Sequence, residues 1–129
     1  MDFCEILITR EAIAVPSATG FAHGCGAVVD FFGVVRPLEE DRPLAGIDYE
    51  AHPRMAEREL RAIVEESSKN PALRGCLLVH RVGFVPAGEI SLFLRVATPH
   101  RQAGYDLSRE IVEALKQRAP IWKQPIFAA

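Results

Sequence analysis

Hydrophobic residues in the first third of the chain gather in short runs typical of strands. Cys4 to Thr9 forms one such run, and the sequence GAVVDFFGVVR from Gly26 to Arg36 forms a longer one, rich in β-branched and aromatic residues. Gly33 interrupts the longer run, and a glycine at that place indicates a bulge or a close backbone approach. Ile13 to Gly26 contains small residues without a period, which predicts a loop or a short helical turn.

The middle of the chain predicts a loop, a strand and then a helix. Pro37 to Gly46 combines two prolines with acidic residues and an arginine, and we expect it to be an exposed, mobile loop. Gly46 to Ala51 returns to a strand-like run. From Pro53 the apolar or small positions repeat at helical spacing, which predicts an amphipathic helix that ends near Asn70-Pro71. Its core-facing positions are Ala56, Leu60, Ile63, Val64 and Ser67.

The last third of the chain predicts a hairpin, a second helix and an extended tail. Leu77 to Val82 and Ile90 to Ala97 are β-type runs, and the turn-forming residues from Val85 to Gly88 between them indicate an antiparallel hairpin. Pro120 stops the helix that follows, and Pro120 to Ala128 is predicted to be extended because its prolines exclude helix. The core stripe of the second helix is Ala103, Leu107, Ile111, Ala114 and Leu115.

This order of elements predicts an α+β fold. Hairpins mixed with two main helices favour a mainly antiparallel sheet over a doubly wound parallel one. The chain has 129 residues, of which 49% are hydrophobic and 25% charged. A chain of this size buries a core of its own, so we expect residues 1–129 to form one domain that needs neither disulfides nor a structural metal for stability.

Charge and hydropathy argue against two classes of partner. Fifteen Lys and Arg residues against seventeen Asp and Glu residues give a net charge of -2, the opposite of the basic surface that binds nucleic acid. No apolar run approaches the roughly 18 residues of a membrane span. Acidic and basic residues within the first twenty positions also interrupt what would be the apolar part of a signal peptide. We therefore expect no nucleic-acid partner and no membrane partner.

The cysteines and histidines form no metal-binding or disulfide pattern. Cys4, Cys25 and Cys76 are an odd number of cysteines without CxxC spacing, and the histidines form no HxxxH pair. Free cysteines are most often small buried hydrophobic residues. We expect a reduced, cytoplasmic protein with no metal and no cofactor.

Three places along the chain carry candidate chemistry, and the first is Gly33-Val-Val-Arg36 at the end of the longer strand-like run. His100-Arg101 follows a strand and the Thr98-Pro99 break, where the second helix begins, so backbone N–H groups and two cationic side chains could meet an anion there. The alternative interpretation of His100-Arg101 is a helix terminus that is exposed to solvent and binds no ligand. His80-Arg81 lies beside an apolar run, where we interpret it as a local hydrogen-bonding pair.

Two lysines near the end of the chain are the other candidates. Lys116 falls on the opposite side of the second helix from the Leu107 stripe, and Lys123 stands in Pro-Ile-Trp-Lys in an otherwise apolar segment. Lys116 shares its side with Tyr105, Arg109 and Val112, a half-apolar row suited to an interface. A solvated lysine in the last helical turn is the alternative, because the helix dipole favours cations there. The residues alone thus predict an anion-binding α+β domain with two lysines.

Five sequence blocks in order resemble the large, catalytic subunit of molybdopterin synthase. They are GAVVDFFGVVR, YEAHPRMAEREL, HRVGFVPAGE, HRQAGYD and LKQRAPIWK, and the resemblance covers about Gly26 to Lys123. The family has an α+β fold and forms a homodimer. Each large subunit receives the C-terminal Gly-Gly tail of a small ubiquitin-like sulfur carrier, which together gives a heterotetramer.

The resemblance implies a reaction and a set of site residues. The carrier's C-terminal thiocarboxylate places two sulfurs on cyclic pyranopterin monophosphate, giving the dithiolene of molybdopterin. The family's two essential lysines match Lys116 and Lys123, and its substrate-binding positions match Arg36, His100 and Arg101. Two departures stand out: Val34 replaces a basic residue of some relatives, and Gln124-Pro125 follows the second lysine where Lys or Arg followed by Glu is usual.

Two other classes of function remain as alternatives. One is a non-catalytic module of the same fold that binds the carrier or another anion without turnover. The other is a sulfurtransferase that works through a cysteine such as Cys25, which would bear a persulfide.

Overall fold

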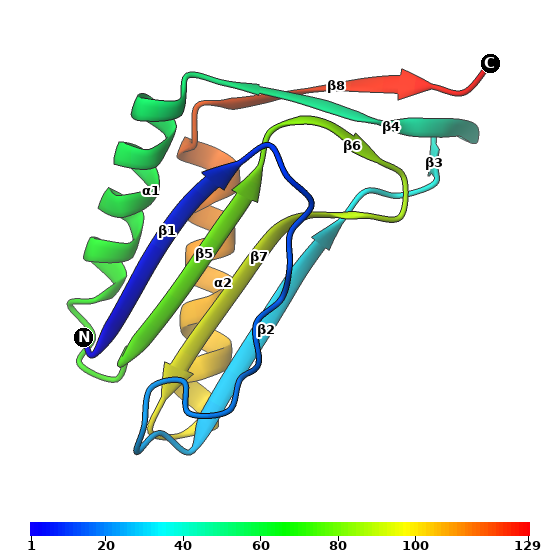
Figure 1. Ribbon diagram of the computed structural model, residues 1–129. Coiled ribbons are helices and arrows are strands. Elements are labelled where there is room, and N and C mark those ends of the chain that lie inside the picture. Colours follow the sequence, from blue (N-terminus) through cyan, green and yellow to red (C-terminus); the bar gives the residue numbers. More distant parts are fainter.

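A four-stranded sheet with two helices on one face makes up the larger part of this computed structural model, which describes residues 1–129 (Figure 1). Its strand order is β1 (Phe3–Thr9), β5 (Gly75–Arg81), β7 (Ile90–Thr98) and β2 (Ala27–Val34). The β1–β5 pair is parallel and the other two pairs are antiparallel. The predicted α+β fold with mainly antiparallel pairing is confirmed, and the parallel pair is an addition that the runs of residues did not predict.

The helices α1 (Pro53–Ser67) and α2 (Arg101–Arg118) pack on the same face of this sheet and on each other. All five predicted core positions of α1 are buried, as are Leu107, Ile111 and Leu115 of α2. They join residues of β1, β5 and β7 in one core, where each fully buried Leu or Ile side chain contributes roughly 1.5–3 kcal/mol. Neither helix combines the length and the apolar character needed to span a membrane.

A smaller sheet lies across one end of the four-stranded sheet (Figure 1). Its central strand β4 (Arg42–Ala51) pairs with β6 (Gly83–Pro86) and with β8 (Ile121–Phe127). The tail is therefore extended, as predicted, and it is paired with a strand of its own chain. The register of β8 runs from Ala51 opposite Ile121 to Leu44 opposite Phe127.

The segment predicted to be a mobile loop, Pro37 to Gly46, is a tight hairpin instead. β3 (Leu38–Glu39) pairs with the first residues of β4, so β4 begins at Arg42 and not at Gly46. Glu40 and Asp41 make the turn with φ values of 51° and 61°. Two successive residues with positive φ are the signature of a two-residue hairpin turn, which usually carries Asn or Gly. The acidic residues at this turn concealed it in the sequence.

The connection between β5 and β7 also differs from the prediction. The two strands do pair antiparallel, with Gly75 opposite Ala97 and His80 opposite Leu92. The predicted turn from Val85 to Gly88, however, begins inside β6, which leaves the first sheet and pairs with β4. Gly83, at a φ of 84°, lies at the start of β6, and its missing side chain permits that backbone conformation.

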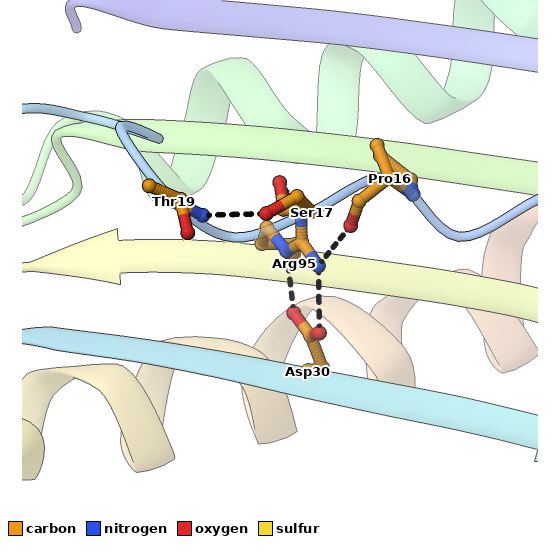
Figure 2. Close-up of polar contacts among 5 residues, drawn as sticks. All are labelled: Pro16, Ser17, Thr19, Asp30 and Arg95. Atoms are coloured by element: carbon orange, nitrogen blue, oxygen red, sulfur yellow. Dashed lines mark hydrogen bonds and ion pairs between the residues drawn. The ribbon is translucent and has the colours of Figure 1, made fainter.

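The segment between β1 and β2 crosses the face of the sheet that carries no helix, and one buried arginine holds it there (Figure 2). Arg95 stands opposite Asp30 in the β2–β7 register, and its Nε and Nη2 donate to the two carboxylate oxygens at 2.7 and 2.9 Å. The same guanidinium donates to the carbonyl oxygens of Ser17 and Pro16 at 3.1 and 2.9 Å. The hydrogen bonds to Asp30 and its negative charge raise the pKa of Arg95, while burial opposes that shift.

We expect Arg95→Met to lower the free energy of unfolding by about 3 kcal/mol, because it leaves the Asp30 carboxylate and two carbonyl groups without their donor. Urea unfolding followed by circular dichroism measures the change. The matched control is Arg61→Met, which removes an exposed ion pair with Glu57 on α1 worth about 0.5 kcal/mol or less. Equal effects of the two substitutions would show that Arg95 does not hold the segment.

Candidate functional site

The two sheets and the end of α2 enclose a cavity of about 550 Å³. It lies on the helix face of the four-stranded sheet, because it is lined by Phe31 and Leu92, whose strands turn these residues toward the helices. Much of its wall is apolar, with Leu44 and Ile47 from β4 and Ile121 from β8. A cavity of this size and character suits a small organic molecule.

Three of the five candidate residues meet at this cavity. Arg36 follows β2, Lys116 lies in the last turn of α2, and Lys123 lies in β8. None of the three takes part in an ion pair. The three cationic groups outnumber Glu39, the one carboxylate that lines the same cavity, and so favour a positive potential there.

The irregularity predicted at Gly33 precedes Arg36 and is confirmed. The β2–β7 register shifts between Gly33 and Val34, and a side chain at Gly33 would place its Cβ 3.1 Å from Leu92. The hydroxyl of Ser91 donates to the Gly33 carbonyl oxygen at 3.2 Å. The bulge and the close approach together end the strand at the cavity wall, where Arg36 follows.

The predicted outward row on α2 is only partly correct. Tyr105, Arg109 and Lys116 are exposed, as predicted, but Val112 packs against the core, and Lys116 also lines the cavity beside Leu115. The helix angle alone could not show this, because the smaller sheet covers the end of α2. Lys123, which stands opposite Tyr49 in the β4–β8 register, belongs to that covering layer.

His100 and Arg101 lie elsewhere on the chain. His100 is the N-cap residue of α2 and Arg101 its first residue, as predicted, and both are exposed. The hydroxyl of Thr98 donates to the His100 carbonyl oxygen at 2.7 Å, while the His100 side chain makes no capping bond. Fifteen residues of helix separate Arg101 from Lys116, a rise of roughly 22 Å. One chain therefore does not bring this pair to the cavity.

Four polar residues of the cavity, Glu39, Tyr49, His80 and Ser91, were not identified as site residues from the sequence. Glu39 and Tyr49 line it, and Oε2 of Glu39 is buried without a hydrogen-bond partner. His80 lines it from β5, where it shares the helix face with Leu78. Alternation along β5 places His80 on that face, but no pattern in the sequence shows that the smaller sheet arches over it.

His80 also makes the local hydrogen bond expected of it. Its Nδ1 lies 2.8 Å from the carbonyl oxygen of Arg81, and its ring meets Tyr49 edge to face at 5.4 Å between centroids. Burial lowers the pKa of His80, and the hydrogen bond to Arg81 opposes that effect. The imidazole is therefore neutral at pH 7.

No cysteine lines the cavity. Cys4 and Cys76 stand side by side in the β1–β5 register, and burial raises the pKa of Cys4 and raises that of Cys76 to about 12. Thiols with raised pKa values are poor nucleophiles at neutral pH. Cys25, the third, is half-buried in the segment that precedes β2.

The chain matches known proteins along most of its length. The family model described as "MoaE protein" matches residues 8–118. A molybdopterin synthase catalytic subunit from Aspergillus niger is 39% identical over 102 residues, which are 79% of this chain and 57% of that protein. The chain spans 53% to 66% of the length of three such relatives.

Solved structures share the fold. A molybdopterin synthase structure from Staphylococcus aureus has a TM-score of 0.84 and 31% identity, and covers 94% of this chain and 90% of that one. The complex of subunits 1 and 2 of the molybdopterin-converting factor from Helicobacter pylori has a TM-score of 0.67 over 83% of this chain and 74% of that one. At 24% identity, the second likeness concerns the fold alone.

We expect the protein to lose stability as the pH falls below about 6.5, the ordinary imidazole pKa. Below that pH the unfolded chain binds a proton at His80 that the folded chain excludes, until the pH reaches the lowered pKa of the folded state. The free energy of unfolding then falls by up to about 1.4 kcal/mol per pH unit. Urea unfolding between pH 7.5 and pH 5.5 measures the slope.

The same measurement on His80→Asn isolates the effect, because Asn keeps a donor near the Arg81 carbonyl and has no group that titrates. We expect a smaller loss of stability on acidification in this variant. His23→Asn, which removes an exposed histidine, is the matched control and should behave as the parent protein does. A slope in His80→Asn equal to that of the parent would contradict the assignment of a buried neutral imidazole.

Proposed function

The chain belongs to the MoaE protein family, and from that premise we propose that it is the catalytic subunit of a molybdopterin synthase. In this proposal it takes sulfur from the C-terminal thiocarboxylate of a small ubiquitin-like carrier protein. It places two sulfurs on cyclic pyranopterin monophosphate and so forms the dithiolene of molybdopterin.

The cluster of Arg36, Lys116 and Lys123 around the cavity is the observation that carries the proposal. A phosphorylated pterin and a thiocarboxylate are both anions, and fixed cations hold two anions together that would repel each other in water. The apolar wall from β4 and β8 suits a fused-ring substrate. Two of the chain's three lysines, Lys116 and Lys123, line this one cavity.

The positions of the lysines suggest a division of labour. Lys123 is in an edge strand beside exposed Trp122, where an inserted C-terminal tail would first arrive, and we assign it to orient the thiocarboxylate. Lys116 is in the last turn of α2, next to the buried Leu115, and we assign it to the substrate carbon framework as acid, base or transient covalent partner.

The remaining candidates, His100 and Arg101, need a second copy of the chain to reach a cavity. A helix keeps them roughly 22 Å from Lys116 of their own chain. We therefore propose a homodimer in which the start of α2 of one copy faces the cavity of the other and grips the substrate phosphate. Exposed apolar residues such as Trp122 and Ile126 on β8 support a role for this tail in the interface.

With one carrier on each copy, the proposed assembly is a heterotetramer. The two-subunit composition of the Helicobacter pylori complex is consistent with a carrier partner for proteins of this fold. The three cysteines, all free thiols, suit a reducing compartment, and we propose that the reaction takes place in the cytoplasm.

The two alternative functions receive less support. A cysteine-based sulfurtransferase needs an accessible thiolate at the site, whereas no cysteine lines the cavity. A non-catalytic module would bind the carrier through the same cations without turnover. Conversion of the pyranopterin by the purified protein separates this module from an enzyme.

We expect Lys116→Ala to abolish turnover while carrier binding persists, because its ammonium group contacts only the substrate. Lys123→Ala should lower turnover and weaken the use of the carrier. Lys69→Ala, which removes the third and exposed lysine, is the control and should keep full activity. Dithiolene formation and carrier titration measure the two effects, and full activity in either cavity variant would refute the roles assigned here.

Mixing two inactive variants tests the shared site. In a dimer of one Lys116→Ala chain and one Arg101→Ala chain, a site shared between copies leaves one cavity intact. An equal mixture that exchanges subunits should then regain about a quarter of the parent activity, since half of its dimers carry one working site. A mixture that stays inactive would show that Arg101 serves a site within its own chain or no site at all.

A further inference from the structure

His80 is a cavity residue to which the proposed reaction assigns no role, as are Glu39 and Tyr49. It is 5% exposed, lies on β5 opposite Leu92, and contributes its ring to the cavity wall. It belongs to no ion pair, and its one hydrogen bond within the chain is the contact with the Arg81 carbonyl. A buried titratable group facing a cavity with one nitrogen unengaged is suited to proton transfer.

The partner of Nδ1 fixes the tautomer. A carbonyl oxygen accepts and never donates, so Nδ1 carries the proton in the neutral ring and donates it at 2.8 Å. Nε2 is then left with a free lone pair. The contact with the Tyr49 ring, edge to face at 5.4 Å, holds the imidazole plane in place.

Burial favours this neutral form. It lowers the pKa of His80, while the hydrogen bond to Arg81 opposes that shift. The lysine and arginine cations at the cavity cannot act as the base, because they have no lone pair to accept a proton. Oε2 of Glu39 is buried without a hydrogen-bond partner. The ionisable groups that share the cavity with His80 are Arg36, Glu39, Tyr49, Lys116 and Lys123.

The proposed sulfur transfer contains a step that requires such a base. A thiocarboxylate that gives up only its sulfur first bonds that sulfur to an electrophilic substrate carbon, while a carbon–oxygen bond at that carbon breaks and its electron pair leaves with the oxygen. The product is a thioester between carrier and substrate. Water must then attack the thioester carbonyl and break its carbon–sulfur bond, so that the sulfur stays on the pterin. Water is a weak nucleophile at neutral pH unless a base removes its proton.

We propose that Nε2 of His80 is the proton acceptor for the water that hydrolyses the carrier–pterin thioester. The proposal rests on the function proposed above. The water oxygen bonds to the carbonyl carbon while one water proton moves to Nε2. The carbonyl carbon–sulfur bond breaks, the carrier leaves with a C-terminal carboxylic acid that ionises, and the imidazolium returns its proton to the thiolate left on the pterin. No electron donor or acceptor is needed.

Single-turnover reactions of the full chain with thiocarboxylated carrier and cyclic pyranopterin monophosphate test the proposal. In His80→Asn the thioester should still form and then accumulate, with its hydrolysis slowed by about 10²- to 10⁴-fold. Mass spectrometry detects the carrier–pterin adduct directly. His23→Asn, outside the cavity, should show the parent rate and no adduct.

The pH profile provides a readout that a merely structural role would not change. In the parent protein, thioester hydrolysis should stay level through neutral pH and slow on the acidic side of the ordinary imidazole range, as His80 gains its proton. His80→Asn should lose this acidic limb. His80→Gln, which keeps an amide near the position of Nε2, should also accumulate the adduct, and it replaces His80→Asn if that variant fails to fold.

The outcomes separate this proposal from the proposed function. A parent protein that makes no dithiolene would refute the function itself. An active parent whose folded His80 variants hydrolyse the thioester at the parent rate would refute only the role of His80. Loss of the acidic limb in Glu39→Gln, with the limb retained in His80→Asn, would assign the base to Glu39 instead.

Discussion

The pairing of β8 with β4 is the interaction on which the candidate site depends. A chain that ended at α2 would leave Leu115 and Lys116 at a bare helix terminus. The turn at Pro120 sends the tail back along β4, and seven register pairs hold it there. That pairing closes the cavity and brings Lys123 to it. A sheet laid across the end of another sheet thus converts a helix end into an enclosed site.

The buried arginine of the large sheet has charged and polar partners, whereas the cations at the cavity form no ion pair. Arg95 is neutralised by Asp30 and also bonded by two carbonyl groups, so loss of this side chain would leave a carboxylate and two carbonyl groups without their donor. Arg36, Lys116 and Lys123 are exposed at the cavity and form no ion pair. Cationic groups without a partner in their own chain are available to a ligand that supplies negative charge. The contrast within one small chain supports a binding role for the cavity.

The sequence predicted local elements well and their arrangement less well. Helical spacing of Leu60, Ile63 and Val64 identified the buried face of α1, because that period depends on nearby residues alone. The turn at Glu40-Asp41 was missed because its residues seldom take positive φ. Arg36 and the lysines were predicted as candidates from their places in the sequence, and the family resemblance then implied their roles. The position of His80 at the cavity depends on a second sheet formed by segments far apart in the chain, which no local pattern contains.

The central claim is that these cations serve sulfur transfer to a phosphorylated pterin, and the most direct measurement is conversion by the unmodified protein. Purified chain is mixed with cyclic pyranopterin monophosphate and carrier, and the dithiolene product is quantified. We expect the dithiolene to form with thiocarboxylated carrier and not with carrier that ends in an ordinary carboxylate. A folded protein that binds the thiocarboxylated carrier and the pterin yet forms no dithiolene would contradict the central claim.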